Sequence, residues 1–100
     1  MRILKKAHYG NGRIAIMVCS EIGENLAWFT INIEDIALEI FGPYAMLISK
    51  ECPEDIIEEL VNNGSIKMDG TTFPVGGETY SLAIADKDWF ESLENYPRAL

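Results

Sequence analysis

Residues 13–19 begin with an arginine and continue with six apolar residues, Ile-Ala-Ile-Met-Val-Cys. Successive side chains of a β-strand point to opposite faces, so this run would be apolar on both of its faces. Such a strand needs cover on both sides, unlike the half-exposed strand of an open sheet. The run therefore predicts an inner strand with packed layers on either side.

Turn signals place further strands on both sides of this run. Residues 2–9 alternate loosely and end at Gly10-Asn11-Gly12, a strong turn signal between β-prone segments. After a polar break, residues 26–33 alternate again and predict a third strand. Because the connections are short, we expect these three strands to form an antiparallel meander.

Residues 34–43 fit both a short helix and an extended segment, because Ile36, Leu38 and Ile40 alternate. Gly42-Pro43 ends whatever forms there. We expect an irregular connection with at most one helical turn, followed by a fourth strand over residues 44–49.

The clearest helix signal covers residues 53–62. Pro53 suits the first position of a helix, and Glu54 and Asp55 place negative charge in the first turn, where the helix dipole favours it. An apolar stripe lies opposite a row of carboxylates. The stripe consists of Ile56, Ile57, Leu60 and Val61.

The remainder of the chain predicts a second hairpin and a closing helix. Residues 66–68, a turn at Asp69-Gly70 and residues 71–75 suggest the hairpin, with Pro74 restricting its strand to an edge or bulge. A turn at residues 76–77 leads into a final strand. Asp86 is a candidate N-cap for the closing helix, whose inner stripe would be Trp89, Phe90 and Leu93.

These elements predict an α+β fold in the order β-β-β-β-α-β-β-α. We expect a mainly antiparallel sheet with two amphipathic helices packed on it. One hundred residues are enough for a single domain over residues 1–100 and too few for two.

The net charge of −8 restricts the class of partner. Proteins that grip nucleic acid neutralise phosphates with Lys and Arg, so direct nucleic-acid binding is disfavoured. No apolar run approaches the roughly 20 residues needed to cross a bilayer, and the N-terminus lacks the apolar segment of a signal peptide. We therefore expect a cytoplasmic protein, a location that two cysteines also fit.

Few residues indicate catalysis. His8 is the only histidine, and Cys52 stands before Pro53 at a helix start, a position that can lower the pKa of a thiol. A catalytic pairing of these two residues is one alternative, and a small semi-buried Cys52 is the other; Cys19 fits a core position. No metal-binding, calcium or nucleotide motif is present, and we expect no cofactor.

The surface is more informative than the motifs. If both helices pack on the same side of the sheet, seven carboxylates could share one exposed, partner-binding region, although two ordinary amphipathic helices would look the same. Trp28, Tyr44 and Trp89 are candidate interface anchors, with Trp89 also a candidate for the core. The seven carboxylates are Glu54, Asp55, Glu58, Glu59, Asp88, Glu91 and Glu94.

Two segments, Tyr-Gly-Asn-Gly-Arg-Ile-Ala-Ile at 9–16 and Thr-Ile-Asn-Ile at 30–33, carry a resemblance. The chain resembles a family of uncharacterised small bacterial proteins carried on plasmids and integrative elements. The likeness extends to residues 64–66 and to the turn at 74–77, and it departs over residues 48–53. Mobile elements carry acidic proteins that block host defences, such as anti-CRISPR and anti-restriction inhibitors, so the resemblance implies a role of that kind.

The sequence thus predicts a non-enzymatic protein that binds a basic surface of another protein, such as a CRISPR effector or other nucleic-acid enzyme. A small enzyme using Cys52 is the first alternative. An oligomeric or structural protein is the second, with a sheet edge near Pro74 or the N-terminal strand pairing across a dimer.

Overall fold

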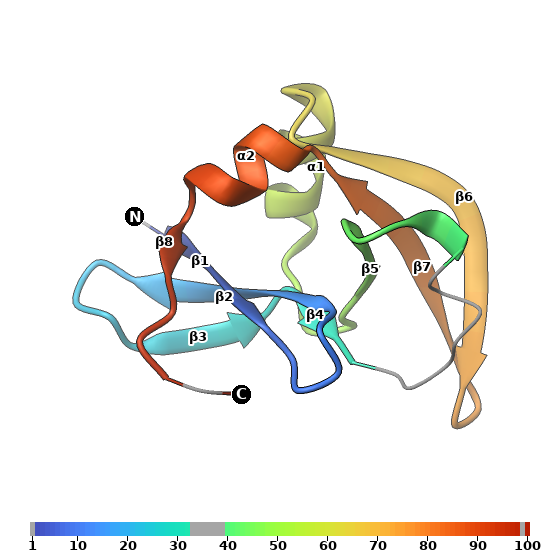
Figure 1. The fold of residues 1–100 in the computed structure, drawn as a ribbon, viewed down its shortest axis with the longest axis horizontal. Coiled ribbons are helices and arrows are strands. Elements are labelled where there is room, and N and C mark those ends of the chain that lie inside the picture. The colour runs from blue at the N-terminus through green and yellow to red at the C-terminus, as the bar shows by residue number, and fades with distance from the viewer. Residues whose placement is uncertain (1, 33–39, 99) are drawn as a thin grey trace.

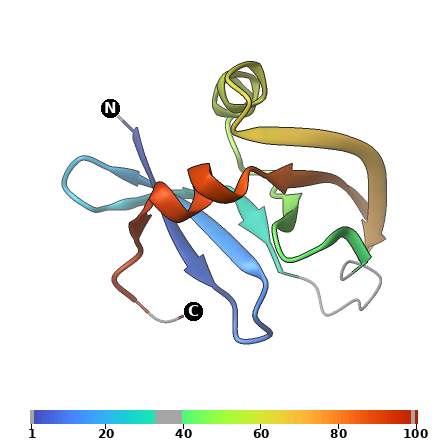
Figure 2. The same ribbon diagram turned by 45° about the horizontal axis from the view of Figure 1, so that its top comes forward.

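The computed structural model of the protein describes residues 2–32, 40–98 and 100, in an α+β fold of two mostly antiparallel sheets and two helices (Figure 1). Both helices lie at the top of Figure 1, whereas in Figure 2 α1 lies at the top and α2 crosses the middle of the view. No helix in these described ranges is long and apolar enough to cross a bilayer. The elements are β1 (Arg2–His8), β2 (Ile14–Ser20), β3 (Asn25–Trp28), β4 (Thr30–Ile31), β5 (Ala45–Ile48), α1 (Glu54–Asn62), β6 (Ile66–Val75), β7 (Glu78–Ala85), α2 (Lys87–Ser92) and β8 (Glu94–Asn95).

The first sheet has the strand order β3-β2-β1-β8. β1 and β2 form a regular antiparallel hairpin, in which Arg2 pairs with Ser20 and His8 with Ile14. β2 is an inner strand whose residues 14–19 are all buried, so the prediction from its two apolar faces is confirmed. β8 pairs with β1 in parallel at Lys5 and Lys6, so this part of the β1 edge is covered.

The second sheet has the order β4-β5-β7-β6, with antiparallel pairing throughout. β6 is one continuous strand, so the turn expected at Asp69-Gly70 is wrong. The pairing register shifts between Met68 and Thr72. Gly70 in this stretch has a φ of 90°, a conformation that glycine adopts readily and residues with a side chain do not. Pro74 lies on β6 at the sheet edge, as its missing N–H requires.

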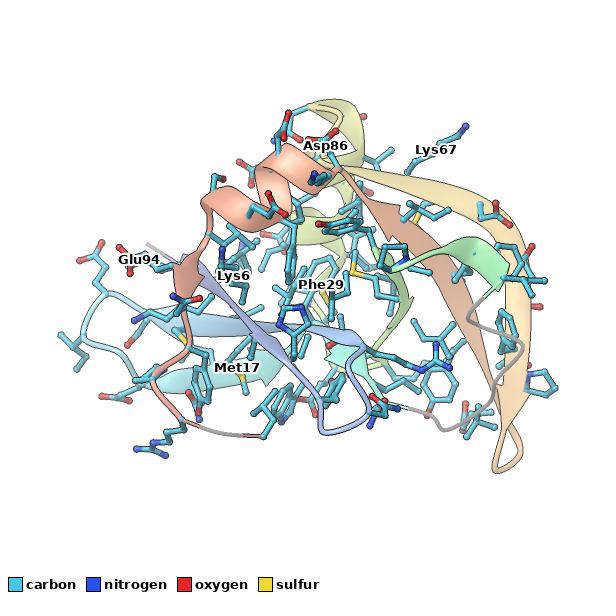
Figure 3. All side chains as sticks on the ribbon, viewed as in Figure 1. Lys6, Met17, Phe29, Lys67, Asp86 and Glu94 are labelled. Carbon is cyan, nitrogen blue, oxygen red and sulfur yellow. The ribbon has the colours of Figure 1, made fainter. Side chains whose placement is uncertain are left out.

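The expected third strand over residues 26–33 is divided at Phe29, which joins β3 in one sheet to β4 in the other. The N–H of Phe29 donates to Ile16 O at 3.0 Å, and its carbonyl accepts from Ser49 N at 2.9 Å. Its side chain is fully buried between the sheets, at the centre of Figure 3. Two sheets therefore replace the single sheet that we expected, because the chain changes partners at this residue.

The main core fills the space between the sheets and the helices, and a second, smaller cluster lies around Leu47 and Leu82 of the second sheet. Both clusters share β5, whose four residues are all buried. The fourth strand expected over 44–49 is thus confirmed. The irregular connection expected over 34–43 lies mostly outside the described residues.

The two helices begin close to the expected positions. Pro53 precedes α1 by one residue, and its carbonyl accepts from Ile56 N at 3.2 Å. Asp86 caps α2, because its carboxylate accepts from Trp89 N at 3.0 Å. α2 ends at Ser92, so Glu94 belongs to β8 and not to the helix surface where we expected it.

Truncating the Phe29 side chain, which is buried between the two sheets, should strongly destabilise the fold. We expect Phe29→Ala to lower the free energy of unfolding by about 3–5 kcal/mol, because it opens a cavity in a close-packed core. Urea denaturation followed by circular dichroism measures the change. Ile22→Ala is the control: Ile22 is 82% exposed, and its truncation should change stability by no more than about 0.5 kcal/mol. Equal effects of the two substitutions would contradict the central role of Phe29.

Candidate functional site

The exposed surface of α1 is mainly acidic, with Val61 and Asn62 exposed at its C-terminal end. Glu54, Asp55, Glu58 and Glu59 are exposed, and no Lys or Arg lies on the helix. The inner face carries Ile56 and Leu60, which are buried in the main core. Residues three or four positions apart lie on the same face of a helix, so the carboxylates share one face while Ile56 and Leu60 share the other. The face that comprises these four carboxylates is called the α1 acidic face below.

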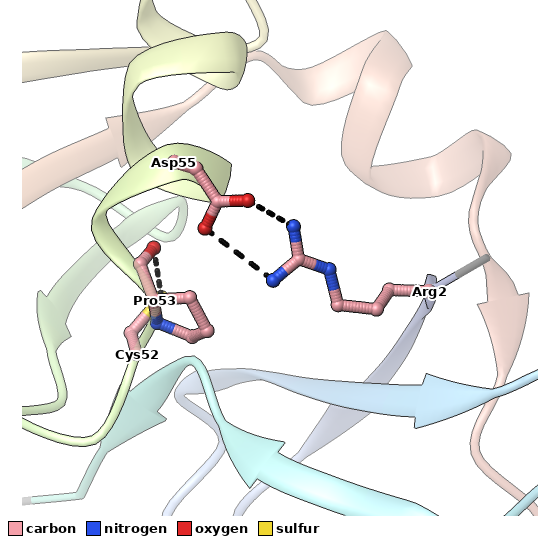
Figure 4. Close-up of polar contacts among 4 residues, drawn as sticks. All are labelled: Arg2, Cys52, Pro53 and Asp55. Carbon is pink, nitrogen blue, oxygen red and sulfur yellow. Dashed lines mark hydrogen bonds and ion pairs between the residues drawn. The ribbon is translucent and has the colours of Figure 1, made fainter.

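One of these carboxylates is paired inside the protein. Arg2, at the start of β1, donates from Nη1 to Asp55 Oδ1 at 3.3 Å, and its Nη2 bonds Oδ2, so that the two side chains form a fork (Figure 4). The hydrogen bond from Arg2 is the main cause that lowers the pKa of Asp55. The pair ties β1 to the first turn of α1. Among the described residues, no ion pair of 4.0 Å or less joins Glu54, Glu58 or Glu59 to β1.

A groove of about 470 Å³ runs beside this face, between β1 and α1. Leu4, Ile56 and Leu60 supply apolar lining, while Arg2 and Glu59 supply charged groups. An apolar floor with charged groups at its margin can accept a long side chain that carries a charged end.

The other three predicted carboxylates, Asp88, Glu91 and Glu94, are also exposed but have a different setting. Glu91 Oε1 accepts from the hydroxyl of Tyr44 at 2.8 Å, and Glu94 lies 3.7 Å from the ammonium of Lys5.

Lys6 also reaches this region, donating from Nζ to the backbone carbonyl of Glu91. Two lysines of β1 thus contact α2 and β8, one at a carboxylate and one at a backbone carbonyl. The seven predicted residues therefore divide into the α1 acidic face and a mixed-charge region around α2.

The structure does not bring Cys52 and His8 together. Cys52 lines a pocket with Met68 and Ser81, whereas the ring of His8 lies edge-on to Phe90, with centroids 5.8 Å apart, in a separate pocket. Burial raises the pKa of Cys52 to about 11, against the opposing effect of the Arg2 charge.

The thiol of Cys52 donates to its neighbour's carbonyl, Pro53 O, at 3.7 Å (Figure 4). A protonated thiol is a poor nucleophile, so the geometry does not provide the activated cysteine that the enzyme alternative needs. Cys19 is also buried, and burial raises its pKa.

The candidate anchors have different surroundings. Trp89 and Tyr44 are half-buried and pack against the main core, so Trp89 takes the core position that was the alternative. Trp28 is half-buried elsewhere and stacks on Tyr9, with ring centroids 6.2 Å apart and an angle of 27° between the ring planes. Sequence analysis missed Tyr9 and its pocket partner Glu51, because no spacing along the chain connects either of them to Trp28.

Within residues 2–32, 40–98 and 100, no three His, Cys, Asp or Glu side chains come close enough together to hold a metal ion. Comparison with protein-family models, with curated proteins and with solved structures gave no match to this chain.

The two thiols should label slowly in the folded protein. With the pKa of Cys52 raised to about 11, little thiolate exists at pH 7, and we expect iodoacetamide to modify Cys52 and Cys19 far more slowly than in the unfolded chain. Mass spectrometry of timed samples measures both rates. Rapid labelling of Cys52 at pH 7 with slow labelling of Cys19 would contradict this assignment and favour the enzyme alternative.

The Arg2–Asp55 pair gives a pH dependence of known sign. The folded-state pKa of Asp55 is lowered, so the pair stabilises the fold above about pH 4 and is lost as the pH falls through that lowered value. We expect Arg2→Gln to raise the Asp55 pKa towards its ordinary value, as measured by NMR titration of the carboxyl carbon. Arg98→Gln, in the exposed tail, should leave it unchanged. An unchanged Asp55 pKa in Arg2→Gln would contradict the pairing.

Proposed function

We propose that the protein is a non-enzymatic binding module whose α1 acidic face docks on a basic surface of another protein. The observation that carries the proposal is the charge distribution of α1, where four exposed carboxylates occur with no cation on the helix. Around α2 and β8, by contrast, Lys5 lies near the Glu94 carboxylate and Lys6 donates to the backbone carbonyl of Glu91. The α1 acidic face is therefore the more strongly negative of the two regions.

The whole chain supports the same docking. A net charge of −8 attracts a cationic partner at long range and repels nucleic acid. The groove between β1 and α1 lies beside the face, and its apolar floor at Leu4 and Leu60 suits the aliphatic stem of a partner lysine or arginine. Charge would then govern the encounter, and the groove would add short-range contact.

The target that we propose is a nucleic-acid enzyme of a host defence system, such as a CRISPR effector or a restriction nuclease. Such enzymes carry basic grooves for phosphates, and a row of carboxylates offers a similar pattern of negative charge. The resemblance of residues 9–16 and 30–33 to proteins of mobile elements favours an inhibitor of this kind. Binding would be stoichiometric, and no group on the protein would need to react.

A pull-down at two salt concentrations tests the proposal directly. The tagged protein would be incubated with lysate of bacteria that express a CRISPR effector with its guide, at about 50 mM and about 500 mM NaCl, since salt screens exposed charges. We expect a basic nucleic-acid enzyme to be retained at low salt and released at high salt, as identified by mass spectrometry. Absence of such a protein at both concentrations would contradict the proposal.

Charge reversal on α1 should abolish this retention. The variant Glu54→Lys/Glu58→Lys/Glu59→Lys removes the negative face but keeps the Arg2–Asp55 pair, and we expect at least about a tenfold loss of affinity because several charge contacts are reversed together. Isothermal calorimetry with the captured enzyme measures it.

The matched control reverses three exposed carboxylates elsewhere, in Glu24→Lys/Asp69→Lys/Glu78→Lys, and has the same net charge. Equal losses in both variants would show that net charge alone, and not α1, drives binding. A fourth substitution, Asp55→Lys, would complete the charge reversal of α1 but would also break the Arg2–Asp55 pair, so its effect would combine both changes.

A further inference from the structure

A second pocket lies where the chain passes from the first sheet to the second. It has a volume of about 260 Å³, and it is separate from the groove beside α1. Its lining comes from the end of the β1–β2 hairpin, from the β3–β4 junction and from the segment after β5. The lining residues are Tyr9, Trp28, Thr30, Ile31, Asn32, Ser49 and Glu51.

One part of the lining is an aromatic pair. Tyr9 and Trp28 stack with a small angle between their rings. Trp28 pairs with the β2 residue Met17, which is buried on the face of the first sheet that points away from the main core. The pair thus covers apolar residues of β2 and also presents half-buried ring surface to the pocket.

Hydrogen bonds hold the ring of Tyr9 in place. Its hydroxyl lies 2.9 Å from Thr30 Oγ1 and 3.3 Å from the carbonyl oxygen of Thr30. Thr30 is itself buried, and its Oγ1 also accepts from Ile16 N at 3.3 Å. A ring fixed by buried partners loses little conformational entropy when a ligand stacks on it.

Among the described residues that line the pocket, one has a charged side chain, Glu51. Its Oε1 accepts from the backbone N–H of Trp28 at 2.6 Å, and its own N–H donates to Ser49 Oγ at 3.2 Å. These bonds orient the carboxylate beside the aromatic pair. No cation within the described part of the chain forms an ion pair with Glu51 at 4.0 Å or less.

From this geometry we propose that the pocket formed by Tyr9, Trp28 and Glu51 binds the guanidinium group of an arginine side chain from a partner protein. A guanidinium is planar, so it stacks on aromatic rings while its N–H groups bond a carboxylate. A lysine ammonium is compact and more strongly hydrated, and it offers no plane to stack. The fixed rings and the oriented carboxylate together therefore select arginine.

The inference deepens the proposed function and rests on it in one respect, because the basic partner supplies the arginine. Glu51 stands three residues before Glu54, the first residue of the α1 acidic face. The segment between them connects the pocket directly to the start of the helix. The negative charge on α1 would attract the partner, and the pocket would bind one of the partner's arginine side chains.

An NMR titration tests the pocket without the partner. The probe is N-acetyl-arginine N-methylamide added to the ¹⁵N-labelled protein at physiological salt, with the citrulline analogue, which is isosteric and uncharged, and the lysine analogue as comparisons. We expect saturable shifts of the amides of Trp28, Thr30 and Asn32 with the arginine compound, in the millimolar range typical of a ligand this small. The other two compounds should give much smaller shifts.

The decisive variant is Glu51→Gln, whose amide oxygen can still accept from the Trp28 N–H while the charge is removed. We expect its affinity for the arginine compound to fall by about tenfold, since a charge-assisted pair becomes a neutral one. Glu78→Gln, an exposed carboxylate on β7, is the matched control and should bind like the wild type. Thermal unfolding and the amide spectrum verify that both variants are folded.

Three results would overturn the inference. They are equal shifts with arginine and citrulline, equal shifts with arginine and lysine, or wild-type affinity in Glu51→Gln. The α1 variant Glu54→Lys/Glu58→Lys/Glu59→Lys separates this proposal from the previous one. If this variant binds the arginine compound but the wild type captures no basic enzyme, the α1 docking proposal is wrong and the pocket proposal is supported. If the wild type captures a basic enzyme but does not bind the arginine compound, only the pocket proposal is overturned.

Discussion

The arrangement of both sheets depends on the two backbone hydrogen bonds of Phe29. Its N–H bonds Ile16 in the first sheet, and its carbonyl receives Ser49 at the end of β5 in the second. Because the ring between these bonds is fully buried, the junction is held by packing as well as by hydrogen bonding. The pocket of Tyr9, Trp28 and Glu51 lies at this same junction, so its geometry follows from the constraint that joins the sheets.

Local pairing decides how the negative charge is distributed. The carboxylate of Glu94 on β8 lies close to Lys5, since β8 pairs with β1 at this residue, and Lys6 donates to the backbone of Glu91 on α2. Arg2, at the other end of β1, forms its hydrogen-bonded ion pair with Asp55 of the α1 acidic face. Surface ion pairs of this kind contribute little to stability. Their consequence is electrostatic, because they leave α1 as the strongly acidic region.

The two residues of the enzyme alternative, Cys52 and His8, have separate surroundings. Cys52 packs in the core at the start of α1, and its raised pKa keeps the thiol protonated. His8 makes an edge contact with Phe90 of α2. Tyr9, Trp28 and Glu51 are ordinary residue types with no motif, yet they line the pocket that we propose binds arginine, because such recognition needs only ring faces and a carboxylate.

The sequence alone determined the features that depend on near neighbours. The two apolar faces of residues 14–19 required an inner strand, Asp86 capped its helix, and Pro74 lay at a sheet edge. These follow from alternation, capping and a missing N–H, which act within a few residues. Only the tertiary structure decided the division of the third strand at Phe29, the continuity of β6 through Asp69-Gly70, and the contacts between β1 and the two acidic regions. Each of these depends on pairing between residues far apart in the chain, and no local pattern encodes which distant strand a residue will meet.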